Sequence, residues 1–84
     1  MQYEPGMIVE SFAGHDSESF YLVVRVEDER VYIADGKRRR LERPKSKNPK
    51  HLRKTLLTAE LLQTKTNKKI RRVLHDLNHG TMSV

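Results

Sequence analysis

The sequence predicts a mainly β protein: a small closed or nearly closed barrel of five strands, followed by one amphipathic helix. Two observations carry this prediction. Five short strand-like segments alternate with tight-turn residues over roughly the first 55 positions. A single apolar stripe at helical spacing then follows residue 66. The chain of 84 residues provides for one domain with a modest core.

The first two strands are predicted over residues 7–12 and 20–27. The second has the most regular alternation of the chain, because apolar residues recur at every other position. Its predicted core face consists of Phe20, Leu22, Val24 and Val26. Phe12 is also expected in the core. Tyr21 and Tyr32 fall on the faces opposite the core, where a tyrosine is either half-exposed or available to stack on a base.

The third and fourth strands are predicted around two turns. Asp28-Glu29 leads into a strand over residues 30–34. Asp35-Gly36 is a tight-turn signal, because glycine accepts a positive φ and aspartate tolerates it. A hairpin partner is therefore expected over residues 37–43, as a strand with a charged outer face and Leu41 as its one apolar residue.

An exposed basic loop and a short closing strand are predicted next. Pro44 and Pro49 bracket the loop, residues 45–48. The closing strand covers residues 51–54, with Leu52 pointing inward. This completes the predicted barrel, whose domain is placed at residues 1–56, with a C-terminal helical extension at residues 57–84.

The extension is predicted to contain one clear helix over residues 67–78, capped by Thr66 or Asn67 and ended by Gly80. A short helical turn capped by Thr58 is expected before it. The helix is expected to dock on the barrel or to stay mobile until the protein binds its partner. The apolar stripe that defines it consists of Ile70, Val73, Leu74 and Leu77.

Charge is the first indication of function. The net charge is +6, but residues 1–36 hold two basic and eight acidic side chains, whereas residues 37–54 hold ten basic and one acidic. So many cations without alternating anions predict a polyanionic partner, and nucleic acid is the usual one. Arginine suits bidentate phosphate contacts. The candidate contacts are Lys37, Arg38, Arg39, Arg40, Arg43, Lys45, Lys47, Lys50, His51, Arg53 and Lys54, with Lys68, Lys69, Arg71 and Arg72 as a second patch.

Other classes of function find little support in the residues. There is no cysteine, so disulfides and thiolate-bound zinc are excluded. His75 and His79 have zinc-ligand spacing but lie opposite the apolar stripe without a third ligand. No nucleophile triad, carboxylate pair or glycine-rich phosphate loop is present, so we expect no enzyme, metal, cofactor or small-molecule substrate. No apolar run is long enough for a membrane and no secretory signal is visible, so a cytoplasmic protein is expected.

Several segments resemble a known family. Gly6 to Val9, Gly14-His15-Asp16 and the following strand resemble the KOW motif of SH3-like barrels that bind RNA. Residues 31–41 and the pair His51-Leu52 resemble the next hairpin of KOW-type large-subunit ribosomal proteins of archaea and eukaryotes. The nearest likeness is to short bacterial KOW-domain RNA-binding proteins similar to that ribosomal family. One departure is Ser17-Glu18, which stands where the family has a Lys-Gly-like or Ala-Gly-like pair.

The resemblance implies an SH3-like barrel that binds ribosomal RNA on the large ribosomal subunit, without catalysis. The main hypothesis is therefore an RNA-binding protein that grips the phosphate backbone. A protein-interaction module of the SH3-like type, associated with the transcription or translation machinery, is the alternative. An enzyme that acts on RNA is a third possibility, for which the sequence offers no candidate residue.

Overall fold

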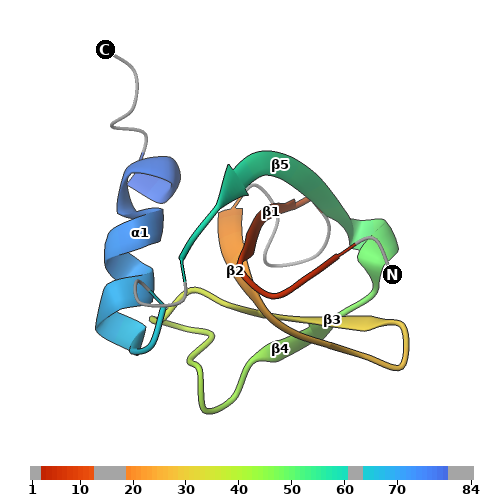
Figure 1. The fold of residues 1–84 in the computed structure, drawn as a ribbon. Coiled ribbons are helices and arrows are strands. Elements are labelled where there is room, and N and C mark those ends of the chain that lie inside the picture. Colours follow the sequence, from red (N-terminus) through yellow and green to blue (C-terminus); the bar gives the residue numbers. More distant parts are fainter. Residues whose placement is uncertain (1–2, 13–18, 61–63, 80–84) are drawn as a thin grey trace.

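The computed structural model describes residues 3–12, 19–60 and 64–79. Within these residues it consists of one strongly curled antiparallel sheet with one α-helix against its outer side (Figure 1). The prediction of a mainly β protein with a C-terminal helix is confirmed. The elements in chain order are β1 (Met7–Ser11), β2 (Ser19–Glu27), β3 (Arg30–Ala34), β4 (Lys45–Lys47), a 3-10 helix (Pro49–His51), β5 (Leu52–Thr58) and α1 (Asn67–His79).

The five strands form a single sheet in the order β4-β3-β2-β1-β5. The first four strands follow one another as a meander, and β5 returns to pair antiparallel with β1. This leaves β4 and β5 as edges, and within the described residues no ladder joins them. The sheet is therefore curled but not closed into a barrel. The three residues of β4 give that edge few hydrogen-bonding groups with which to close it.

The inner side of the curl holds the first core. It draws on four of the strands and on the segment before β1, and the hydroxyl of Tyr3 donates a hydrogen bond to Leu52 O at 3.1 Å. Leu52 is 5% exposed, so its predicted inward direction is confirmed. The buried members of this core are Tyr3, Val9, Tyr21, Val23, Val31, Ile33 and Leu52.

Both faces of β2 pack against a core, and a β-bulge exchanges the two faces partway along the strand. Val23 pairs with Ile33 and Arg25 pairs with Tyr32, so Val24 is the extra residue. The bulge reverses the alternation, because it turns Arg25 outward and Val26 toward the first core. The predicted single core face of β2 is therefore wrong, and Tyr21, only 5% exposed, is a core residue.

Helix α1 covers part of the outer face and builds the second core. Its first turn is capped by Thr66, whose Oγ1 accepts a hydrogen bond from Lys69 N at 3.1 Å. Ile70 and Leu74 are almost fully buried against Ile8 and Leu22. Near the other end, Asn78 Oδ1 accepts from the backbone N–H of Phe20 at 2.7 Å, and Asn78 Nδ2 donates to its carbonyl at 3.1 Å. The predicted apolar stripe is confirmed, and the helix is docked on β2.

The fourth strand lies in a different place from the one predicted. Residues 37–43 form bends and turns, whereas Lys45–Lys47, the predicted exposed loop, form β4 and pair with β3. Both predictions are wrong for one reason. The side chain and backbone of Asp35 fold the chain back locally, so the partner of β3 enters several residues later. Lys47 is only 8% exposed.

Two smaller predictions also fail. Phe12 is 45% exposed, because β1 ends at Ser11 and its ring lies beyond the strand. Thr58 does not cap a helical turn, since it is the last residue of β5, which runs four residues further than predicted at its C-terminal end. The predicted stop at Gly80, the loop around Gly14 and the tail at 81–84 lie outside the described residues.

Candidate nucleic-acid interface

Residues 36–43, here called the basic loop, are shaped by Asp35. Its Oδ1 accepts hydrogen bonds from Lys37 N at 2.8 Å and Arg39 N at 2.9 Å. The backbone N–H groups of Asp35 and Gly36 both donate to Arg39 O, at 2.8 and 3.1 Å. Aspartate favours such local turns because its side chain satisfies nearby backbone donors. The loop is therefore held as a compact turn.

The basic loop is fastened to the start of α1. Asn67 Oδ1 accepts from Leu41 N at 2.8 Å, and Asn67 Nδ2 donates to Glu42 Oε1 at 2.6 Å. This hydrogen bond is the main reason that the pKa of Glu42 lies below its usual value. Arg71 Nη1 donates to Gly36 O at 2.7 Å. Loop and helix are thus one unit.

Gly36 makes this close approach possible. Its φ of +77° is unfavourable for other residues, and a Cβ at this position would lie 2.2 Å from Asn67 O. The sequence predicts the turn at Gly36 but not its contact with Asn67. Asn67 is predicted only as a possible helix cap. No local pattern indicates that its side chain binds Leu41, 26 positions earlier in the chain.

The two elements together present one cationic area, called the loop–helix surface. The side chains of Lys37, Arg38, Arg43, Lys68 and Arg72 make no ion pair or hydrogen bond with another described residue. Arg40 Nε lies 3.4 Å from Glu42 Oε2, and Arg39 is half-buried with its Nε inside the protein. The surface consists of the exposed cations Lys37, Arg38, Arg40, Arg43, Lys68, Lys69, Arg71 and Arg72.

A second set of cations lies on and beside β5. Arg53 Nη1 is 3.6 Å from Glu10 Oε1, and its Cζ is 5.1 Å from the ring centre of Phe12. Lys54 Nζ lies 5.4 Å from the ring centre of Tyr3. This set, called the β5 group, consists of Lys50, His51, Arg53 and Lys54, all exposed.

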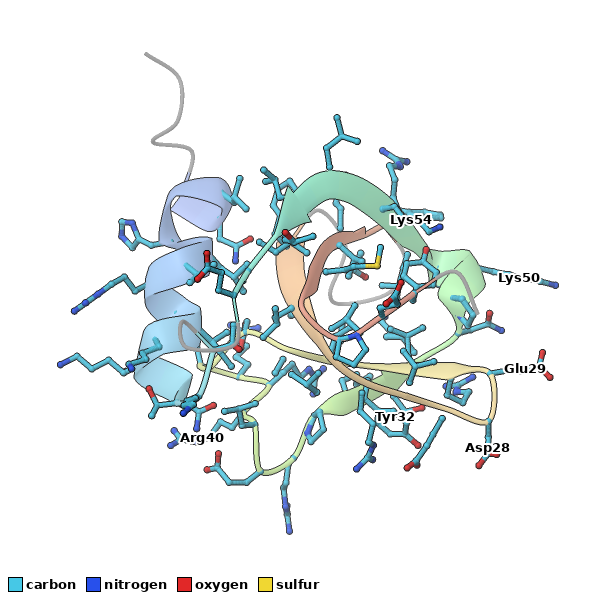
Figure 2. All side chains as sticks on the ribbon, viewed as in Figure 1. Asp28, Glu29, Tyr32, Arg40, Lys50 and Lys54 are labelled. Carbon is cyan, nitrogen blue, oxygen red and sulfur yellow. The ribbon has the colours of Figure 1, made fainter. Side chains whose placement is uncertain are left out.

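The structure separates residues that the sequence predicted as one patch. Arg40 lies beside the N-terminal end of α1, whereas Lys50 and Lys54 lie on the other side of the curled sheet (Figure 2). Lys45 and Lys47 join neither set. Their register opposite Ile33 and Val31 turns them toward the inner face.

Two acidic residues lie far from the loop–helix surface. Asp28 and Glu29 form the tip of the β2-β3 hairpin, with φ of 50° and 62°, as in the tight turns that suit strand twist. This tip points away from Arg40 (Figure 2). The acidic hairpin tip and the loop–helix surface therefore lie at different ends of the molecule, whereas Lys50 of the β5 group lies on the same side as Glu29 (Figure 2). The separation of the tip from the loop–helix surface orients the molecule in the field of a polyanion.

Within the described residues, no group of three His, Asp or Glu side chains is placed to hold a metal ion. His75 and His51 are exposed, and the side chain of His79 lies outside the described part. The helices that the structure describes include none with the length and apolar character to cross a membrane. No protein-family model matches the chain, and a search of curated proteins finds no significant relative.

Proposed function

We propose that this protein binds RNA by its phosphate backbone through the loop–helix surface, and that ribosomal RNA of the large subunit is its target. One observation carries the proposal. Five exposed cations from two fastened elements have no anionic partner among the described residues. Such a surface repels itself until a polyanion neutralises it.

The form of the surface favours RNA backbone over smaller anions. Its cations are spread over a loop and about one and a half turns of a helix, so they suit a row of phosphates better than a single one. Arginine supplies five of the eight, and its planar fork matches phosphate oxygens. Binding of this kind depends on shape and charge more than on base sequence.

The ribosomal target rests on the resemblance to KOW-type proteins. In support, the curled sheet has the order β4-β3-β2-β1-β5, with a 3-10 helix between its two edge strands. We take this sheet as an opened SH3-like barrel, with the basic loop after β3 as its RNA-binding element. Such a protein would act in the cytoplasm, without catalysis.

The direct test is the salt dependence of RNA binding. Neutralising about six phosphates lowers affinity by roughly 10³-fold between about 50 and 200 mM salt. Fluorescence anisotropy with a large-subunit ribosomal RNA fragment measures this slope, and cosedimentation with isolated subunits tests the target. Arg38→Gln with Arg40→Gln should reduce both. A nearly flat salt response, or unchanged cosedimentation of the variant, contradicts the proposal.

A second candidate function, a protein-interaction module, is favoured by the irregular edge of β5. Val9 pairs with Lys54 and Met7 with Thr58, so β5 carries two more residues than β1 over this stretch. Thr55 Oγ1 donates to Ile8 O at 2.7 Å in the irregular part. The neighbouring Leu56 is fully exposed and Leu57 is 44% exposed.

Exposed leucines on an edge strand are a place where a partner protein can add contacts. If this is the main function, partners captured from a lysate remain bound after nuclease treatment and are lost in Leu56→Ser. Capture that disappears with nuclease supports RNA binding instead.

A further inference from the structure

Helix α1 covers only one end of the outer face of the sheet. Leu22 packs against the helix, and its β3 partner Ala34 is fully buried. Beyond the bulge at Val24, the next pair is Arg25 and Tyr32, and neither belongs to the helix contact. Tyr32 lies on the side of β3 that faces away from the interior of the curl (Figure 2).

The uncovered end carries a cross-strand row of side chains. Arg25 on β2 pairs with Tyr32 on β3, which pairs with Ser46 on β4. The Cζ atom of Arg25 lies 4.2 Å from the ring centre of Tyr32. Arg30 Nε donates to Ser46 Oγ at 2.9 Å, which holds a second guanidinium beside the row.

The Arg25 guanidinium has an in-plane partner as well as the ring. Its Nε lies 3.7 Å from Glu27 Oε2, and the side chain is still 51% exposed. An ion pair at Nε uses the edge of the guanidinium and leaves its flat faces available. One face rests on Tyr32, and flat surfaces of this kind are those on which bases stack.

We propose that Arg25 and Tyr32 form a stacking site for an unpaired nucleobase. The inference rests on the proposed function, because the base belongs to the same RNA whose phosphates lie on the loop–helix surface. It adds a substrate class: RNA in which an unpaired base, in a loop or bulge, adjoins a backbone segment.

The position of the row supports this assignment. Arg43 ends the basic loop and Ser46 is only three residues further on, a span of at most about 11 Å. If a phosphate of the RNA contacts Arg43, the neighbouring nucleotides are therefore within reach of the row formed by Arg25, Tyr32 and Ser46. The β-bulge is what makes the site, since regular alternation would turn Arg25 toward the first core.

The experiment compares two RNAs of equal charge. One is a fluorescein-labelled hairpin with an adenosine loop, and the other is the same hairpin with an abasic loop. Wild-type protein should bind the adenosine loop about 5- to 150-fold more tightly, the range expected for one stacked base. Tyr32→Leu and Arg25→Lys, which keeps the charge but loses the plane, should both remove this preference. Tyr32→Phe should keep it, and urea unfolding checks that each variant is folded.

The results separate the two proposals. Salt-dependent binding to both RNAs without preference for the adenosine loop overturns the stacking site alone, as does a preference that survives in both Tyr32→Leu and Arg25→Lys. Failure of wild-type protein to bind either RNA overturns the RNA-binding function itself. The comparison of the two RNAs with wild-type protein needs no substitution. It can therefore overturn the stacking site even when one of the variants does not fold.

Discussion

The basic loop and the β5 group belong to the same basic stretch of the sequence, and α1 adds further cations to the loop. The loop–helix surface and the β5 group nevertheless differ in whether their cations have partners within the protein. On β5, Arg53 lies close to Glu10 and Phe12, and Lys54 lies over Tyr3. On the loop–helix surface, the guanidinium of Arg38 and the ammonium of Lys68 have no such partner among the described residues. The comparison shows that a run of charge in a sequence is not a single surface.

The physical difference is the cost of binding. A cation already paired with a carboxylate or a ring gains less from a phosphate, because it must give up or share that contact. A cation held by a folded loop without a partner gains the full attraction. We therefore expect the loop–helix surface to dominate RNA affinity.

The largest expected effect comes from removing equal charge from the two regions. Changing Arg38, Lys68 and Arg72 to glutamine should weaken RNA binding by roughly 10²-fold at about 100 mM salt and make the salt slope shallower by about 2 to 3. The matched variant changes Lys50, Arg53 and Lys54 to glutamine and should lose several-fold less affinity. Equal losses, measured by anisotropy, mean that the two regions do not differ.

An effect of similar size in free energy, but on stability instead of affinity, is expected from Gly36→Ala, which breaks the contact between loop and helix. The new Cβ would meet Asn67 O at 2.2 Å, so we expect a loss of about 2–4 kcal/mol in the free energy of unfolding, from backbone strain and the clash. Gly6→Ala is the control, because Gly6 also has a positive φ but its Cβ would lie 3.2 Å from Ala59 O. Urea unfolding should show a clearly smaller loss for Gly6→Ala.

Two asparagines at opposite ends of α1 offer a finer comparison. Asn67→Ala removes the hydrogen bonds to Leu41 and Glu42, and Asn78→Ala removes those to Phe20. Each should cost about 1–2 kcal/mol of stability. Only Asn67→Ala should also weaken RNA binding, because it frees the basic loop. A similar loss of affinity in Asn78→Ala argues against the loop–helix contact as the cause.

The smallest effect concerns acid pH. The hydrogen bond from Asn67 lowers the pKa of Glu42 below its ordinary value of 4.5. Ionised Glu42 therefore stabilises the fold at neutral pH, and this contribution is lost as the pH falls below 4.5 through the lowered pKa. Because Glu42 is exposed, the loss is small. Urea midpoints over this acid range should fall slightly more for wild type than for Glu42→Gln, and parallel curves would contradict the prediction.

The sequence predicts the elements whose pattern is local. Alternation places β2 and β3, and the stripe from Ile70 to Leu77 places α1 with its face. Leu52 is correctly placed inward because it is the one apolar residue in a basic stretch. In each case, a short segment contains the information that decides its structure.

The sequence-based predictions that are wrong concern features that depend on contacts between distant parts of the chain. Lys45–Lys47 contains no apolar residue, so only the open edge of β3 makes it a strand. The bulge at Val24 follows from pairing with β3 and is invisible in the alternation itself. The candidate site has the same limit. Its cations are evident from composition, but their division into two regions depends on Asn67 and Arg71, which join the helix to the loop.

The second core can form only late in synthesis of the chain, because it needs the C-terminal helix. Synthesis proceeds from the N-terminus, so all five strands exist before Ile70 and Leu74 are available to cover Ile8 and Leu22. Until then, an apolar face of the nascent sheet that is buried in the complete protein is exposed to water. A product cut short before residue 67 would keep that face uncovered, and it should be a target for chaperones or a seed for aggregates.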